Sequence, residues 1–106
     1  MSVTKDQAII KARKFISLLI SKGVDVSEAY LFGSAIMDRT DENSDIDLAI
    51  VSKAFTGIPF YDVKKISKYR RLIDLRIEIH PYSFDDILDN PPVFFLKIKK
   101  EGIPVN

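Results

Sequence analysis

Residues 45–50 alternate strictly between polar or small side chains and bulky apolar ones. This pattern constrains the fold more than any other part of the chain. Every even-numbered position is isoleucine or leucine, whereas the odd-numbered positions are two aspartates and an alanine. Successive side chains of a β-strand point to opposite faces, so this period predicts a strand with one apolar face in a core. Residues 74–80 repeat the pattern, with polar side chains between Leu75, Ile77 and Ile79.

Segments with helical periodicity surround these two strands. Thr4 and Gln7 form a predicted capping box ahead of the first helix, and Gly23 is a predicted left-handed stop after it. We expect helices over residues 5–22, about 61–72 and 93–100, a further helix start at Ser83, and additional strands over 29–32 and 103–105. This alternation indicates a single domain, residues 1–106, of the α/β (α+β) class. Its small mixed sheet is expected to be covered by helices, largely on one face.

Composition limits the metal sites and the binding partners that we expect for this chain. The chain has no cysteine and one histidine, which excludes thiolate metal sites and a multi-histidine zinc site within one chain. The net charge of +1 does not support a strongly basic nucleic-acid binder, so nucleic acid is not expected as a partner. The sequence shows neither a secretory leader nor an apolar run long enough to span a bilayer. A cytoplasmic location is therefore expected, without a membrane partner.

Asp45 and Asp47 are candidate metal ligands. Residues two apart in a strand project from the same face, with Cα atoms about 6.6 Å apart, so both carboxylates can converge on hard cations. Mg²⁺ prefers such oxygen ligands and fills its remaining positions with water and substrate phosphates. The simpler alternative, a solvated strand face, stays open, although aspartate is uncommon in strands.

Gly33 and Ser34 form a candidate nucleotide-binding turn. Glycine lets the backbone approach a ligand closely, and free N–H groups at a helix start attract phosphate, although a Gly-Ser pair alone is also typical of a simple turn. The combination is more specific. Leu31-Phe32-Gly33-Ser34, followed further along by Ser44-Asp45-Ile46-Asp47-Leu48, resembles the signature of the polymerase-β-like nucleotidyltransferase superfamily, and the short chain resembles its minimal members.

The resemblance implies a mechanism. Gly33 and Ser34 would hold the β- and γ-phosphates of ATP or another nucleoside triphosphate. Asp45 and Asp47 would be catalytic ligands of Mg²⁺, and a third carboxylate on a neighbouring strand would complete the metal site and help to activate an acceptor hydroxyl. Positioning and charge neutralisation supply most of the catalysis in such transfers.

Two residues compete for the third position. We favour Glu78, in the middle of the predicted strand, over Asp74, at its start, while an ordinary exposed charge is the alternative for Glu78. The resembled family more often has aspartate here, and it often has a basic residue and a glycine where this chain has Met37-Asp38. These departures put nucleotide affinity in question. His80 shares the face of Glu78, and both a proton-carrying and a structural role are open.

The resemblance also implies a partner. In minimal members, the acceptor is often a hydroxyl on a helical protein of the HEPN type, and the pair forms a toxin–antitoxin module with the nucleotidyltransferase as the antitoxin. The expected function is therefore transfer of AMP from ATP to such a hydroxyl. The alternative is a weak or inactive antitoxin that neutralises its partner by contact alone, and a homo-oligomer is left open. The basic side of the predicted helix over 61–72 either steers an anion or is a solvated face.

Overall fold

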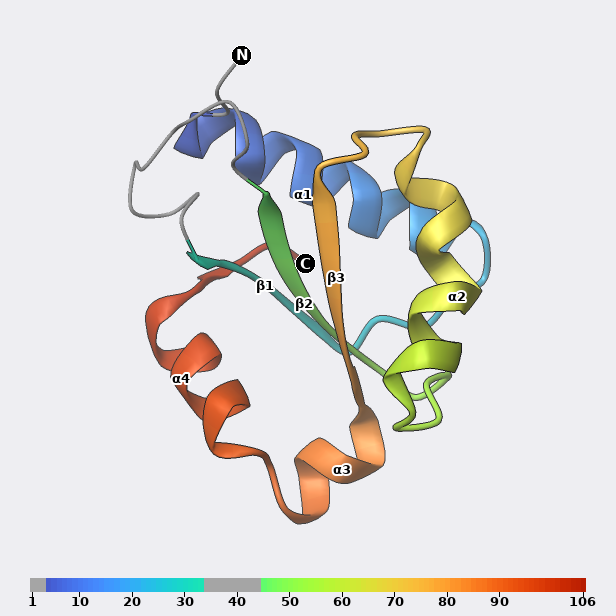
Figure 1. The fold of residues 1–106 in the computed structure, drawn as a ribbon, viewed down its shortest axis with the longest axis vertical. Helices are drawn as coiled ribbons and strands as arrows, with labels where there is room; N and C mark the ends of the chain where they lie inside the picture. The colour runs from blue at the N-terminus through green and yellow to red at the C-terminus, as the bar shows by residue number, and fades with distance from the viewer. Residues whose placement is uncertain (1–3, 34–44) are drawn as a thin grey trace.

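The computed structural model describes residues 4–33 and 45–106. Within them the chain forms one mixed sheet of four strands in the order β3-β2-β1-β4, together with four helices (Figure 1). Along the chain the elements are α1 (Lys5–Ser21), β1 (Glu28–Phe32), β2 (Ile46–Ser52), α2 (Pro59–Arg70), β3 (Ile77–Ser83), α3 (Phe84–Asp89), α4 (Val93–Glu101) and β4 (Ile103–Pro104). The predicted α/β class and mixed sheet are confirmed.

Strand pairing follows from the connections. β1 pairs antiparallel with β2, and the short β4 pairs antiparallel with the other edge of β1. β2 and β3 run parallel, with α2 as the crossover between them, because parallel neighbours need a long connection. The beginnings of β2 and β3 therefore lie side by side, next to the end of β1.

The termini of α1 are fixed by local sequence, as predicted. The Thr4 hydroxyl accepts a hydrogen bond from the Gln7 backbone N–H, and the Gln7 side chain accepts one from the Thr4 N–H, both at 3.1 Å. Gly23 has a φ of 83°, the left-handed conformation that ends many helices. α2 begins at Pro59, two residues before the expected start, because proline suits the first helical turn, where its missing N–H is not needed.

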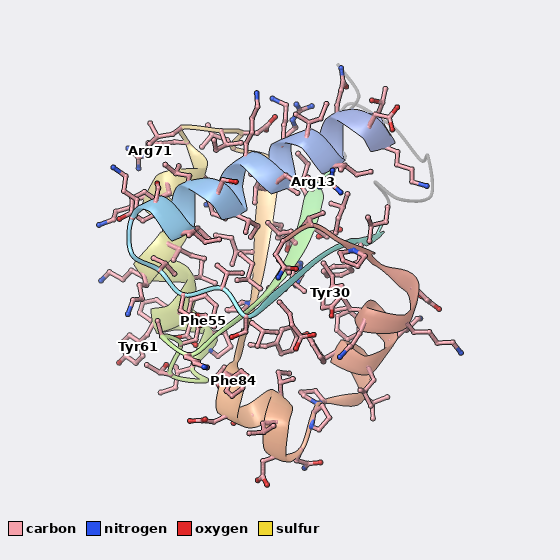
Figure 2. All side chains as sticks on the ribbon, turned by 180° about the vertical axis from the view of Figure 1, so that it is seen from behind. Arg13, Tyr30, Phe55, Tyr61, Arg71 and Phe84 are labelled. Atoms are coloured by element: carbon pink, nitrogen blue, oxygen red, sulfur yellow. The ribbon has the colours of Figure 1, made fainter. Side chains whose placement is uncertain are left out.

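Helices cover both faces of the sheet. The first face carries the alternating residues Ile46, Leu48 and Ile50, which pack with α1 and α2 into the larger apolar cluster. Seen from behind, α1 crosses in front of the sheet (Figure 2). The second face has a smaller cluster built on α4, which contains Tyr30, Ala49, Val51, Phe95 and Ile98. We expected helices largely on one face, so this second cluster is an addition to the prediction. It covers part of its face, and the rest of that face carries the polar residues described below.

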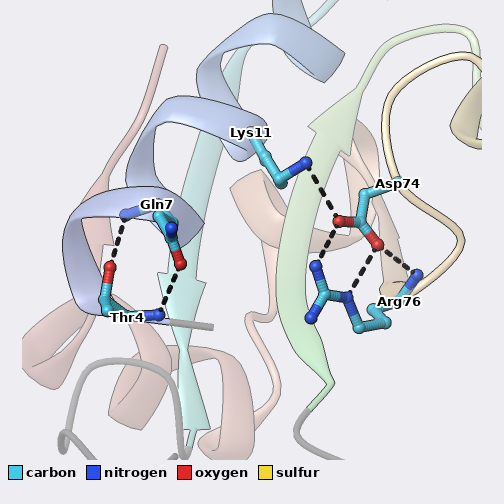
Figure 3. A network of polar contacts seen from close by, with 5 residues as sticks. All are labelled: Thr4, Gln7, Lys11, Asp74 and Arg76. Carbon is cyan, nitrogen blue, oxygen red and sulfur yellow. Dashed lines mark hydrogen bonds and ion pairs between the residues drawn. The ribbon is translucent and has the colours of Figure 1, made fainter. Parts of the chain in front are cut away.

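β3 begins later than its sequence pattern predicts. The strand starts at Ile77, and Leu75 is 72% exposed rather than buried. The cause is Asp74, whose carboxylate accepts hydrogen bonds from the Arg76 backbone N–H at 2.8 Å and from the Arg76 guanidinium at 3.0 and 2.7 Å. Lys11 of α1 adds an ion pair at 3.2 Å (Figure 3). These contacts hold residues 74–76 in a turn.

Replacing Asp74 with asparagine is expected to lower the free energy of unfolding by about 1–3 kcal/mol at pH 7, because two cations lose their partner. The Arg76 hydrogen bonds hold the pKa of the Asp74 carboxyl well below its usual range. The stabilisation is therefore complete above the unfolded-state pKa of about 4 and declines as the pH falls below it. Urea unfolding at pH 7 and pH 3 should show a smaller difference at pH 3, with exposed Asp89→Asn as the control. An equal difference at both pH values would contradict this linkage.

Candidate active site

A cluster of three side chains lies near the beginnings of β2 and β3. The parallel register places Asp47 directly opposite Glu78, and His80 follows on the same face. His80 Nε2 lies 3.2 Å from Asp47 Oδ1 and 4.0 Å from Glu78 Oε1. One ligand atom from each of the three residues lies within 4.8 Å of the others, the only such group of potential metal ligands among the described residues. The site therefore arises from strand register, which joins segments distant in the sequence.

Asp45 adds a further carboxyl group to this cluster. It directly precedes β2, is exposed, and shares a hydrogen bond with the Glu78 side chain. Burial raises the pKa of Glu78, and the charge of Asp47 and the hydrogen bond with Asp45 raise it further. A carboxyl whose pKa is raised by neighbouring carboxylates marks a place where negative charge accumulates. A cation would relieve this repulsion.

Gly33 closes the cluster on the side of β1. Its φ of 79° is a conformation that favours glycine, and a Cβ placed there would collide with the Oδ2 atom of Asp47. Phe32, the preceding residue, pairs with Asp47 across the antiparallel ladder. The end of β1 thus approaches the Asp47 carboxylate too closely for a side chain at position 33. Ser34, like Met37 and Asp38, lies outside the described residues.

Replacing Gly33 with alanine is expected to lower the free energy of unfolding by about 1–3 kcal/mol and to weaken Mg²⁺ binding, because the methyl group displaces the Asp47 carboxylate. Gly23→Ala is the matched control: its φ of 83° gives similar strain, but nothing lies within 4 Å of the added Cβ. Urea unfolding and the Mg²⁺-induced rise in melting temperature measure the two effects. Equal Mg²⁺ responses in both variants would show that the close approach of Gly33 to Asp47 is unimportant.

The two candidates for the third carboxylate have different surroundings. Glu78 adjoins Asp47 across the strand pair, and its side chain is 53% exposed, so it remains accessible to a ligand. Asp74 is 9% exposed and is fully engaged by Arg76 and Lys11 in the turn before β3. Asp74 has a structural partner for each carboxylate oxygen, whereas Glu78 faces other acids.

His80 and Phe32 show what sequence reasoning left out. The sequence placed His80 on the face of Glu78 but left its role open, and the structure directs its Nε2 atom to Asp47. Phe32 was noted only as part of a motif, yet its ring contacts the His80 ring edge-to-face, with centroids 4.9 Å apart. The available signal was its position next to Gly33, whereas its pairing with Asp47 depends on the register of β1 and β2.

The donor set fits a divalent cation. Carboxylate oxygens of Asp47 and Glu78 are hard ligands of the kind that Mg²⁺ and Mn²⁺ prefer, and Asp45 stands beside them. Glycine at position 33 keeps the Asp47 carboxylate in place, because a Cβ there would collide with it. His80 already contacts Asp47 and can orient that carboxylate, as residues that hydrogen-bond to metal ligands commonly do.

Comparison with known families decides the identity. The family model described as "Polymerase beta, Nucleotidyltransferase" matches residues 14–105, nearly the whole chain. The chain belongs to this nucleotidyltransferase family. A crystal structure of a candidate nucleotidyltransferase from Sulfolobus solfataricus shares the fold, with a TM-score of 0.65 and 17% sequence identity over 94% of this chain and 80% of the other. A comparison with curated proteins finds no match.

Family membership gives the general chemistry of this nucleotidyltransferase. The reaction class is nucleotidyl transfer, and a nucleoside triphosphate is the implied substrate. Such enzymes typically use divalent metal ions, and the acidic cluster at β2 and β3 provides a suitable place for them. None of the helices in residues 4–33 and 45–106 has the length and apolar character needed to cross a membrane.

Proposed function

We propose that this nucleotidyltransferase transfers AMP from ATP, in a Mg²⁺-dependent reaction, to a hydroxyl group of a HEPN-type partner protein and thereby acts as the antitoxin of a toxin–antitoxin pair. The observation that carries the proposal is the placement of Asp47 opposite Glu78, with Asp45 beside them. Carboxyl groups at the beginnings of two adjacent strands are hard oxygen donors that suit metal-assisted phosphoryl transfer.

In this mechanism Asp45, Asp47 and Glu78 would hold Mg²⁺, which would supply positive charge to neutralise the triphosphate. Gly33 and Ser34 hold the β- and γ-phosphates of ATP. Glu78, on the exposed side of the cluster, accepts the proton of the acceptor hydroxyl. The acceptor oxygen forms a bond to the α-phosphorus, the bond between that phosphorus and the bridging oxygen of the β-phosphate breaks, and pyrophosphate leaves.

The acceptor is proposed from the resemblance to minimal nucleotidyltransferases. The described residues form the nucleotidyltransferase fold, and the surface around the site is where they could contact an acceptor. A folded protein that presents a hydroxyl on a helix can bring its own complementary surface. α4 also presents an exposed apolar side chain, Val93, which suits such a contact.

The competing function is an antitoxin that neutralises its partner by contact without catalysis. Glutamate in place of aspartate at the third carboxylate favours it, because the longer side chain of Glu78 is half exposed and less firmly positioned. Met37-Asp38, where relatives often have a basic residue and glycine, favours it as well.

The test combines the protein, a HEPN-type partner, Mg²⁺ and ATP labelled on the α-phosphate. We expect label on the partner, and none when EDTA removes the metal. Neutralisation of the partner in cells should be lost in the Asp45→Ala/Asp47→Ala variant. Neutralisation that survives this double change, without any labelling by the wild-type protein, would support the contact mechanism instead.

A further inference from the structure

α4 carries two consecutive phenylalanines with opposite environments. Phe95 is 1% exposed and packs in the second apolar cluster, where its ring contacts Tyr82 at 5.0 Å and Tyr30 at 6.2 Å. Phe94 is 54% exposed. Phe95 and Ile98 already anchor α4 to the sheet, so packing of the helix does not account for a phenylalanine at position 94.

A chain of ring contacts connects Phe94 to the acidic cluster. The Phe94 and Phe32 rings meet edge-to-face, with centroids 6.0 Å apart and planes at 80°. Phe32 contacts the His80 ring in the same manner, and His80 Nε2 lies 3.2 Å from Asp47. Edge-to-face pairs of this kind are favourable and orient the rings. Phe94 is therefore an exposed aromatic side chain that two successive ring contacts connect to the acidic cluster.

We propose that Phe94, supported by Phe32, stacks against the nucleobase of the nucleoside triphosphate. The inference rests on the proposed function, because it assumes that a nucleotide binds at the carboxylates. Phe32 directly precedes Gly33, so the same end of β1 would support the base-stacking ring and begin the phosphate-binding turn. A nucleotide carries both phosphates and a base, so one ligand could contact the turn at Gly33 and the ring of Phe94.

The stacking contact should not discriminate between nucleobases. Every nucleobase has a π-face, so a phenyl ring binds all four without reading their edges. Phe94 should therefore strengthen the binding of ATP and GTP by similar factors, relative to a ligand that carries phosphates alone. The competing occupant is an apolar surface of the acceptor protein, which would leave nucleotide binding independent of Phe94.

Calorimetric titration with ATP and with inorganic tripolyphosphate, each with Mg²⁺, tests the proposal on the full chain. The wild-type protein should bind ATP more tightly than tripolyphosphate. Phe94→Ala should weaken ATP binding by about 5- to 150-fold and leave tripolyphosphate binding unchanged, whereas Phe94→Tyr should retain ATP binding. Leu96→Ala is the matched control, since Leu96 is 49% exposed on the same helix. Its affinities should equal those of the wild type, and all melting temperatures should stay close together.

Several results would overturn the stacking role. The first is a wild-type protein that binds ATP no more tightly than tripolyphosphate. The second is a Phe94→Ala variant whose affinity falls equally for both ligands or for neither. The third is a Leu96→Ala variant that loses as much affinity for ATP as Phe94→Ala does. Failure of the proposed function has a different signature. In that case, the wild-type protein would bind tripolyphosphate with Mg²⁺ no better than Asp47→Asn does.

Discussion

Replacing Asp47 with asparagine is expected to lower the rate of the proposed AMP transfer by roughly 10²–10⁴-fold, the largest loss that we expect from any single change. Asp47 occupies the centre of the cluster. It lies opposite Glu78 in the strand register, contacts His80 and adjoins the backbone of Gly33. Asparagine keeps the shape of the side chain but removes the charge that attracts a divalent cation.

The same change should not unfold the protein. Without metal, Asp47 and Glu78 repel each other, and the charge of Asp47 contributes to the raised pKa of Glu78. Asp47→Asn relieves this repulsion, so the metal-free variant should melt at or slightly above the wild-type temperature. Excess Mg²⁺ should raise the melting temperature of the wild type and of Asp89→Asn, but not that of Asp47→Asn. A wild-type transfer rate or Mg²⁺ response in Asp47→Asn would exclude Asp47 as a metal ligand.

The sequence predicts those parts of the fold that depend on neighbouring residues. The start of α1 follows from Thr4 and Gln7, which satisfy each other's backbone N–H groups, and its end follows from Gly23. The strand that carries Asp47 follows from the alternation of side chains, which needs no partner to be recognised. In each case the decisive interaction or pattern spans only a few residues.

Long-range contacts explain what the sequence could not supply. The turn before β3, held by Asp74 and Arg76, also receives an ion pair from Lys11 of α1, a contact across the fold that no local pattern predicts. The placement of Glu78 opposite Asp47 depends on the parallel register of β2 and β3, and no local pattern fixes that register. Similarly, Phe94 is an ordinary helical phenylalanine in the sequence, and only its contact with Phe32 brings it to the site.

Glu78→Gln should lower the transfer rate by roughly 100-fold or more, because it removes the third charge of the proposed metal site and the proposed proton acceptor. Asp74→Asn is the informative comparison. Both variants exchange a carboxylate for an amide in or just before β3, but the Asp74 carboxylate is occupied by Arg76 and Lys11. We expect Asp74→Asn to lose stability and keep its rate of transfer per folded molecule, and Glu78→Gln to lose rate and keep its stability.

Single-turnover transfer and urea unfolding, measured on both variants, separate the two carboxylates. A loss of rate in Asp74→Asn with an unaffected Glu78→Gln would reverse the assignment of the third ligand. Glu78→Asp adds a test of length, because it keeps the charge but removes one methylene from a side chain that is 53% exposed. If charge at this position is what matters, Glu78→Asp should retain far more activity than Glu78→Gln. A rate above the wild type would mean that the freedom of the longer glutamate limits catalysis in this chain.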